Sequence, residues 1–151
     1  MRALIQRVKR CSVRIDGSLH SAIGAGILIL LGIKKGDTPD DARFLAEKST
    51  QLRIFDDPDG TMNFSVIDVH GSVMIVSQFT LYGDTRKGNR PSYTDAASPP
   101  AAEELYEQFV REVRTLSSEK RVKTGVFRAM MEVELVNDGP VTVMVESKNH
   151  G

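Results

Sequence analysis

The stretch that decides the fold is Ile27–Ile33, which reads ILILLGI. A continuous apolar run of this length, preceded by the turn residues Gly24–Gly26, is typical of a strand covered on both faces. We therefore expect it to lie centrally in a β-sheet. Val73–Val76 is a second wholly apolar segment and predicts another buried strand, which we expect to end in Ser77–Tyr82.

Other segments alternate between apolar and polar residues, a pattern typical of half-buried strands. Ala3–Leu19 reads as two strands joined at Asp16–Gly17, a dipeptide that favours a tight hairpin turn. Asp57–Gly60 has Pro and Gly at the positions that a type I turn prefers, so strands should flank it. Alternation returns in Met131–Leu135 and in Val141–Val145. Much of the sheet should therefore be antiparallel.

Two segments predict helices. The first starts at Thr38, a capping residue that is followed by a proline and two aspartates, and should run to about Leu52. The second starts at Ser98, and its apolar residues recur at helical spacing at Leu105, Phe109, Val113 and Leu116. The sequence therefore predicts an α+β fold, mostly antiparallel, with two main helices.

Length and composition bound the class of protein. The 151 residues are expected to form one domain, residues 1–151, with 40% hydrophobic and 26% charged residues. The longest apolar run is too short to span a bilayer, and we expect a cytoplasmic protein without membrane contact. Twenty basic residues balance twenty acidic ones, which argues against a broad positive surface for nucleic acid. Any contact with RNA should therefore be local.

The sequence contains no recognisable metal or cofactor site. Cys11 is the only cysteine, and we expect it to be a small buried apolar residue. The histidines His20, His70 and His150 have no spacing that would place two rings on one helix face. We therefore predict neither a metal centre nor a cofactor.

The first candidate for chemistry is the end of the second buried strand, at Ser77, Gln78, Phe79 and Thr80. At this place side chains and backbone amides can face a pocket held by a rigid element. The plain alternative is that such polar residues simply decorate the end of a strand. No histidine lies nearby in the sequence to activate a hydroxyl nucleophile, although partners of a nucleophile are often remote in the chain.

The second candidate is a dense basic patch in the long polar segment Gly83–Pro100, formed by Arg86, Lys87 and Arg90. Basic side chains in a loop are suited to contact phosphate. A solvated loop with no ligand is the alternative interpretation.

The third candidate is Asn137–Pro140, NDGP, which interrupts the alternating pattern of the last segment. Proline cannot donate to a sheet ladder, and Asn and Gly tolerate a left-handed backbone, so the first interpretation is a break between two strands. A two-residue turn usually reads Asn-Gly or Asp-Gly without an added proline, however. The second interpretation is a rigid backbone wall at Gly139 and Pro140 that reads stereochemistry without a side chain.

Taken together, SQFT at Ser77–Thr80 and NDGPVT at Asn137–Thr142 resemble the motif pair of the D-aminoacyl-tRNA deacylases. The resemblance covers nearly the whole chain, from MRALIQRV through LRIFDD and SQFTLYGDTRKGNRPS to the final strand. It implies a homodimer with a sandwich- or barrel-like sheet core. It also implies hydrolysis of the ester bond of D-aminoacyl-tRNA, and of glycine mischarged on alanine tRNA, because a clash that rejects L-amino acids does not reject achiral glycine.

The resemblance further implies roles for particular residues. Gly139 and Pro140 of one subunit would enter the pocket of the other subunit beside its SQFT segment, and would reject L-amino acids by a clash with their side chains. Arg7 would help to hold this Gly-Pro pair in place, and a surface charge on an edge strand is the alternative for it. Met131 and Ala102 match positions that line the terminal-adenosine pocket or its entrance.

An aminoacyl ester is already activated, so the reaction needs positioning, a donor for the developing oxyanion, and water or a ribose hydroxyl. By the resemblance, the backbone amides of Phe79 and Thr80 would bind substrate or stabilise the oxyanion, with the Thr80 hydroxyl as a rival nucleophile. Arg86, Lys87 and Arg90 would contact tRNA phosphates.

Two other functions stay open at the level of the sequence. One is a dimeric module that binds the tRNA acceptor end without catalysis. The other is a general serine or threonine hydrolase of free esters, for which RNA would be dispensable. Loss of the ester from D-aminoacyl-tRNA but not from its L counterpart would separate the deacylase from both.

Overall fold

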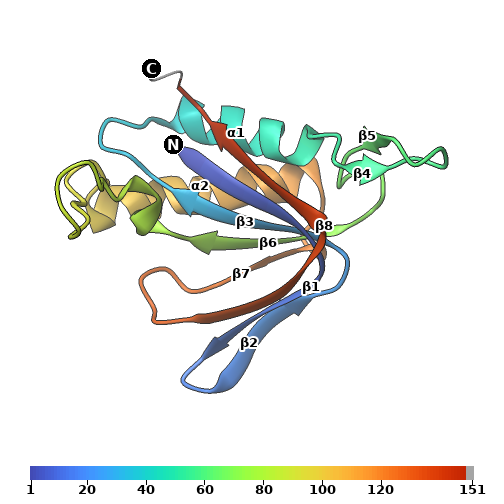
Figure 1. Ribbon diagram of the computed structural model, residues 1–151, viewed down its shortest axis with the longest axis horizontal. Coiled ribbons are helices and arrows are strands. Elements are labelled where there is room, and N and C mark those ends of the chain that lie inside the picture. The colour runs from blue at the N-terminus through green and yellow to red at the C-terminus, as the bar shows by residue number, and fades with distance from the viewer. Residues whose placement is uncertain (149–151) are drawn as a thin grey trace.

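Strand β3 (Gly26–Gly32), which contains most of the ILILLGI run, lies in the middle of a six-stranded sheet (Figure 1). The computed structural model describes residues 1–148, and the expectation for His150 lies outside that range. The strand order is β2-β1-β3-β6-β7, and β8 pairs with β1. The other strands of this sheet are β1 (Arg2–Ile15), β2 (Ser18–Ile23), β6 (Ser72–Ser77), β7 (Val122–Thr124) and β8 (Glu132–Glu146).

The side chains of β3 alternate between two hydrophobic cores, and this explains its continuous apolar sequence. Ile27, Ile29 and Leu31 belong to the larger core, which the helices also enter. Leu28 points into a smaller core that includes Met74 and Val76 of β6. Because both faces of the strand are covered, every position along it favours an apolar residue. The prediction of a central buried strand is confirmed.

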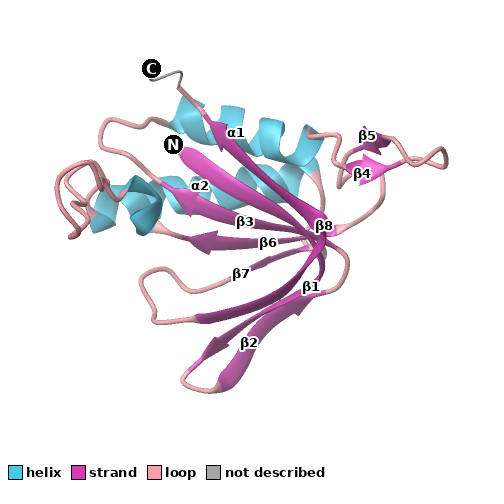
Figure 2. Cartoon of the chain, in the orientation of Figure 1, coloured by secondary structure: helices cyan, strands magenta, loops and turns pink. Residues whose placement is uncertain are grey.

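The sheet is mostly antiparallel and curls into a nearly closed, barrel-like shape (Figures 1 and 2). Strand β1 pairs antiparallel with β2, β3 and β8, whereas the pairs β3–β6 and β6–β7 are parallel. Asp16 and Gly17, at the β1–β2 turn, have φ angles of 51° and 79°, as a two-residue hairpin turn requires. The predicted turn at 57–60 joins β4 (Phe55–Asp56) to β5 (Met62–Phe64).

Two helices pack against each other on one face of the sheet (Figure 2). They are α1 (Pro39–Gln51) and α2 (Pro99–Leu116), close to the predicted ranges. The Thr38 amide donates to the Asp41 carboxylate at 2.7 Å, which satisfies a donor at the start of α1. Phe109 and Val113 of α2 are fully buried in the larger core. The α+β fold with two main helices is confirmed. No helix within residues 1–148 is long and apolar enough to cross a membrane.

The second buried strand ends earlier than predicted. Strand β6 stops at Ser77, and Phe79–Tyr82 form a short 3-10 helix, η1, instead of continuing the strand. The Gln78 amide still donates to the Leu31 carbonyl of β3 at 2.8 Å. The chain then turns, because the Leu81 amide donates to the Gln78 carbonyl at 3.2 Å. The SQFT motif therefore spans a strand end and a helical turn.

The prediction that Asn137–Pro140 separates two strands is wrong, because β8 runs through this motif as one strand. The pairing with β1 is interrupted there, however. Val8 pairs with Asn137 and Gln6 with Thr142, so four residues of β8 stand opposite Arg7 alone, as a bulge. The Asn137 side chain bridges the bulge, since it accepts from the Val141 amide at 2.8 Å and donates to Thr142 at 3.0 Å.

Candidate active site

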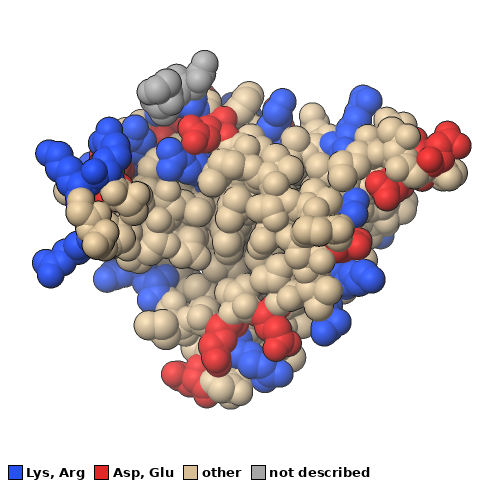
Figure 3. Space-filling model, viewed as in Figure 1, with Lys and Arg blue, Asp and Glu red and all other residues tan. Residues whose placement is uncertain are grey.

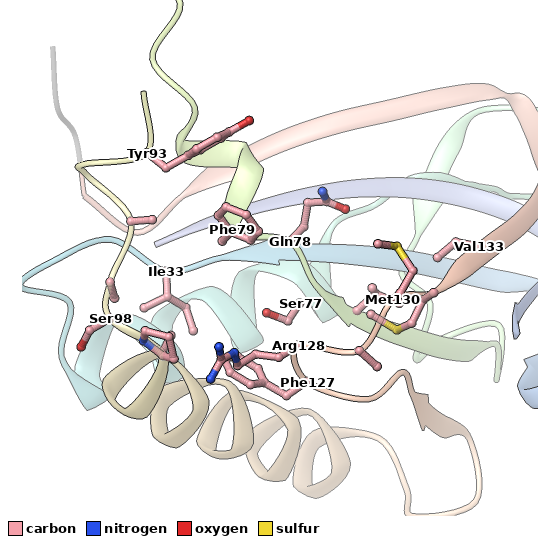
Figure 4. Close-up of a pocket in the computed structure, with 17 residues that line it drawn as sticks. Ile33, Ser77, Gln78, Phe79, Tyr93, Ser98, Phe127, Arg128, Met130 and Val133 are labelled. Carbon is pink, nitrogen blue, oxygen red and sulfur yellow. The ribbon is translucent and has the colours of Figure 1, made fainter. Parts of the chain in front are cut away.

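A cavity of about 770 Å³ opens at the carboxyl end of β6. Its walls come from this strand end, the segment that leads into α2, and the loop 125–131 before β8 (Figure 4). Five residues predicted from the sequence line it, namely Ser77, Gln78, Phe79, Ala102 and Met131. The structure thus brings together residues that are up to 54 positions apart in the chain (131 − 77).

Three residues of the SQFT segment, Ser77, Gln78 and Phe79, line the cavity, and Thr80 follows directly after them. Phe79 and Thr80 are the first residues of η1, and the first amides of a helix have no acceptor within it. Within residues 1–148, neither amide donates to a carbonyl outside η1. These two donors are therefore free to bind a ligand at the strand end.

Thr80 and Phe79 differ in what their side chains face. Thr80 does not line the cavity, and its hydroxyl accepts a hydrogen bond from the side-chain amide nitrogen of Gln78. Phe79 is 57% exposed, and its ring forms a T-shaped pair with the ring of Tyr93, with the ring centroids 5.1 Å apart. An exposed aromatic pair at a cavity entrance offers a surface on which a base or another ring can pack.

The cavity also contains residues that the sequence did not predict as part of the site. Phe127, Arg128 and Met130 come from loop 125–131, and Tyr93 from the long polar segment. Phe127 lies 5.8 Å from Tyr106 between ring centroids, and the Tyr106 hydroxyl donates to the Ile75 carbonyl of β6 at 3.1 Å. This contact ties the loop to the strand end. Large apolar residues in a turn are the sequence signal that could have identified it.

Most of the cavity wall is apolar, and its chemistry is restricted accordingly. Among the described residues that line it there is no histidine, aspartate, glutamate, lysine or cysteine. Cys11 lies in the smaller core, where burial raises the pKa of its thiol to about 11. Within residues 1–148 no three metal-binding side chains are grouped together. The available polar groups in the cavity are hydroxyls, the Gln78 amide, backbone amides and one guanidinium.

Gly139 and Pro140 do not line this cavity, so one chain does not bring the two sequence motifs together. Both residues are exposed, and the peptide bond between them is cis. Beneath them lies Arg7, which is only 8% exposed and donates to the Asp138 carbonyl at 3.0 Å and the Ile54 carbonyl at 2.6 Å. The interpretation of Arg7 as a surface charge on an edge strand is wrong, since β1 is paired on both sides.

The predicted basic patch lies in the loop between η1 and α2 and outside the cavity. Arg86 is held by Asp84 in a fork, with nitrogen–oxygen distances of 2.7 and 2.9 Å, and this pairing lowers the pKa of the Asp84 carboxyl to about 2. Lys87 and Arg90 are exposed. Figure 3 shows Lys and Arg gathered at the end of the molecule from which this loop projects, while the middle of the same face is uncharged.

Similar proteins identify the class. A D-aminoacyl-tRNA deacylase of Fervidobacterium nodosum is 55% identical over 148 residues, and one of Anaeromyxobacter dehalogenans is also 55% identical over 148; each match covers 98% of both chains. A solved structure titled "c-Myc DNA Unwinding Element Binding Protein" superposes with a TM-score of 0.94 at 40% identity, covering 98% of this chain and 99% of that one. A probable eukaryotic D-amino acid tRNA deacylase shares the fold, with a TM-score of 0.79 at 18% identity over 96% and 98% of the two chains.

The fold and these relatives define a hydrolase of the deacylase class. The family model described as D-Tyr-tRNA(Tyr) deacylase matches residues 4–146. The chain belongs to this family.

Proposed function

We propose that the protein hydrolyses the ester bond of D-aminoacyl-tRNA and acts as a homodimer of single-domain subunits. The observation that carries the proposal is the cavity at the SQFT segment, in a chain that belongs to a deacylase family. The terminal adenosine and its esterified amino acid occupy the cavity, where Ala102 and Met131 contact the nucleoside. The remainder of the tRNA stays outside.

The chemistry proceeds without a side-chain base. A water molecule attacks the ester carbonyl carbon, the bond to the ribose oxygen breaks, and the ribose oxygen leaves with a proton as a hydroxyl. The free amides of Phe79 and Thr80 donate to the oxygen that becomes negative. The neighbouring ribose hydroxyl of the substrate orients the water, since no acid or base of the protein lines the cavity within the described residues.

Selection by chirality is assigned to Gly139 and Pro140 of the partner subunit. Two observations support this assignment: the pair is exposed and anchored from beneath by Arg7, and it is absent from the cavity of its own chain. In the dimer the pair closes the partner's cavity, and its carbonyls occupy the space that an L side chain needs. Glycine has no side chain to clash, so glycine mischarged on alanine tRNA is also a substrate.

Ester loss from matched substrates tests the function. D-tyrosyl-tRNA and L-tyrosyl-tRNA are incubated with the protein, and the D ester should disappear at least about 100-fold faster, equivalent to about 2.7 kcal/mol in the transition state. Stability of both esters would favour a module that binds without catalysis. Equal loss of both esters would show that the protein is an esterase without chiral selection. Cleavage of free D-tyrosyl esters at the same rate would show that the RNA is not needed for the reaction.

The Thr80 hydroxyl is expected to be dispensable for catalysis. Its side chain does not line the cavity and is engaged by Gln78, so Thr80→Ala should retain activity within about threefold. Single-turnover hydrolysis of D-tyrosyl-tRNA measures this, and Thr80→Ser serves as the matched variant that keeps the hydroxyl. A loss of several orders of magnitude in Thr80→Ala alone would make Thr80 the nucleophile.

The basic loop is proposed to contact tRNA phosphates through Arg86, Lys87 and Arg90. Their replacement by alanine should flatten the slope of log affinity against log salt by about one to two units, because each phosphate contact accounts for roughly 0.7 to 0.9. Arg86 should contribute least, since Asp84 already neutralises it. Binding of uncharged tRNA at several salt concentrations measures the slope.

A matched control removes three other exposed positive charges, Lys48, Arg111 and Lys120, which lie on the helices or just beyond them. This variant has the same net charge as the loop variant. If both variants flatten the slope equally, the loop has no specific role in tRNA binding.

A further inference from the structure

Among residues 1–148, Arg128 contributes the single charged side chain that lines the candidate active site. The other residues of the wall are apolar or neutral. Figure 4 shows the Arg128 guanidinium extended over α2, toward the end of the helix that carries Ser98. Within residues 1–148 no carboxylate forms an ion pair with it. A guanidinium at the rim of an apolar cavity is therefore available for an anionic ligand.

The backbone at Arg128 does not favour arginine. The Ala129 amide donates to the Val126 carbonyl at 3.1 Å, which closes a four-residue turn with Arg128 at its third position. Its φ angle is +67°, a left-handed conformation in which glycine is the favoured residue. The turn would form more easily with glycine, so folding does not explain the arginine. Residues held in such conformations cluster at ligand sites.

We propose that Arg128 binds the 5′-phosphate of the terminal adenosine and thereby positions the esterified ribose in the cavity. This inference rests on the proposed function, since it deepens the description of the same site. The guanidinium matches a phosphate because its planar fork donates to two oxygens at once. It acts on the nucleotide and not on the reacting ester, so it is a positioning residue that lowers KM and leaves kcat nearly unchanged.

The surface beyond Ser98 continues the path that a strand of RNA would take. A groove of about 180 Å³ lies there, and it shares Ala97 and Ser98 with the main cavity. Lys34 and Lys35 line it together with Asp37, whose buried carboxylate pairs with the N-terminal ammonium at 2.8 Å. The next phosphates of the strand pass these lysines. The positive side chains thus lie along the route from the cavity to the outside, and the apolar cavity itself holds the uncharged nucleoside.

Two short substrates isolate the contact, namely 3′-O-(D-phenylalanyl)adenosine with and without a 5′-phosphate. The wild-type protein should cleave the phosphorylated ester with a kcat/KM about tenfold higher, through a lower KM. Arg128→Gly should cleave both equally, within about twofold. Arg128→Lys keeps the charge but lacks the planar fork, so it should keep only part of the preference. Arg128→Gly should unfold at the same temperature as the wild type or higher, since glycine suits the turn.

Arg111→Gln removes an exposed positive charge in the middle of α2 and should leave the tenfold preference unchanged. The double variant Lys34→Gln, Lys35→Gln should bind full-length tRNA more weakly. It should leave the preference between the two short esters intact. The assignment to Arg128 is overturned if Arg128→Gly keeps the tenfold preference, or if the lysine pair abolishes it.

Two further outcomes are separable. If the wild-type protein cleaves D-phenylalanyl-tRNA but shows no preference for the 5′-phosphate, the phosphate contact is wrong and the proposed function stands. If it cleaves none of these esters, the proposed function itself is wrong. A D-aspartyl pair is included as well: a defect of Arg128→Gly confined to the D-aspartyl esters would assign Arg128 to the acidic side chain and overturn the phosphate contact.

Discussion

Replacing Gly139 with alanine should reduce the discrimination between D- and L-aminoacyl-tRNA by at least about 100-fold. A Cβ atom at this position would lie 2.8 Å from the Val141 side chain and 3.0 Å from the Val141 amide nitrogen. The φ angle of +134° also disfavours any L residue other than glycine. The exposed segment must therefore move, and its carbonyls no longer occupy the space that an L side chain needs. The ratio of single-turnover rates on D- and L-tyrosyl-tRNA measures the loss.

A mixing experiment tests whether Gly139 acts on the partner subunit. Ala102→Phe should fill the cavity and inactivate a subunit while leaving its Gly139 intact. Heterodimers of this variant with Gly139→Ala then combine one open cavity with the intact Gly139–Pro140 pair of the other subunit, and should regain D-selective hydrolysis. If the mixture shows only the unselective activity of Gly139→Ala, the Gly139–Pro140 pair acts on the cavity of its own subunit. If Gly139→Ala by itself keeps the wild-type ratio of D to L rates, the pair has no role in chiral selection.

Replacing Arg7 with glutamine should lower the free energy of unfolding by about 3 kcal/mol, which corresponds to a fall in Tm of roughly 10 °C. The Arg7 guanidinium is buried and donates to the carbonyls of Asp138 and Ile54, and it lies 3.8 Å from the Asp56 carboxylate. Glutamine is too short and has too few donors to satisfy both carbonyls. Thermal and chemical unfolding measure the change.

Arg14→Gln is the matched control, because Arg14 lies on the same strand and is exposed. It should change stability by less than about 0.5 kcal/mol. Arg7→Gln should also weaken the discrimination between D and L esters, since the Asp138 backbone loses its anchor. Equal stability of the two variants would show that the Arg7 contacts contribute nothing to the free energy of unfolding. Full chiral discrimination in Arg7→Gln would show that the hydrogen bond from Arg7 to Asp138 is not needed for chiral selection.

The sequence determined the elements whose patterns are local. The apolar run at 27–33 predicted a strand buried on both faces, and β3 is that strand, with its side chains divided between two cores. Helices α1 and α2 begin where Thr38 and Ser98 predicted. The Asp16–Gly17 turn was also predictable, because a hairpin of this kind depends on two residues alone.

Local patterns were less reliable where pairing with a distant segment competes with propensity. Pro140 predicted a break, yet β8 continues, because Asn137 bridges the bulge and Arg7 of a strand more than 130 positions away binds the Asp138 carbonyl. The strand through SQFT was predicted too long for a related reason. Its pairing with β3 ends at Leu31, and the chain then turns into η1, where the Leu81 amide donates to the Gln78 carbonyl.

The candidate site also combines features that the sequence identified with features that only the tertiary structure decided. The sequence by itself identified the SQFT and NDGP motifs and the family, because these are contiguous runs of residues. Only the tertiary structure placed Phe127 and Arg128 at a cavity formed with Ser77, and set Gly139 apart from that cavity. The physical reason is that a cavity is the space left between elements after they pack, and its wall depends on long-range contacts that no single stretch of sequence encodes.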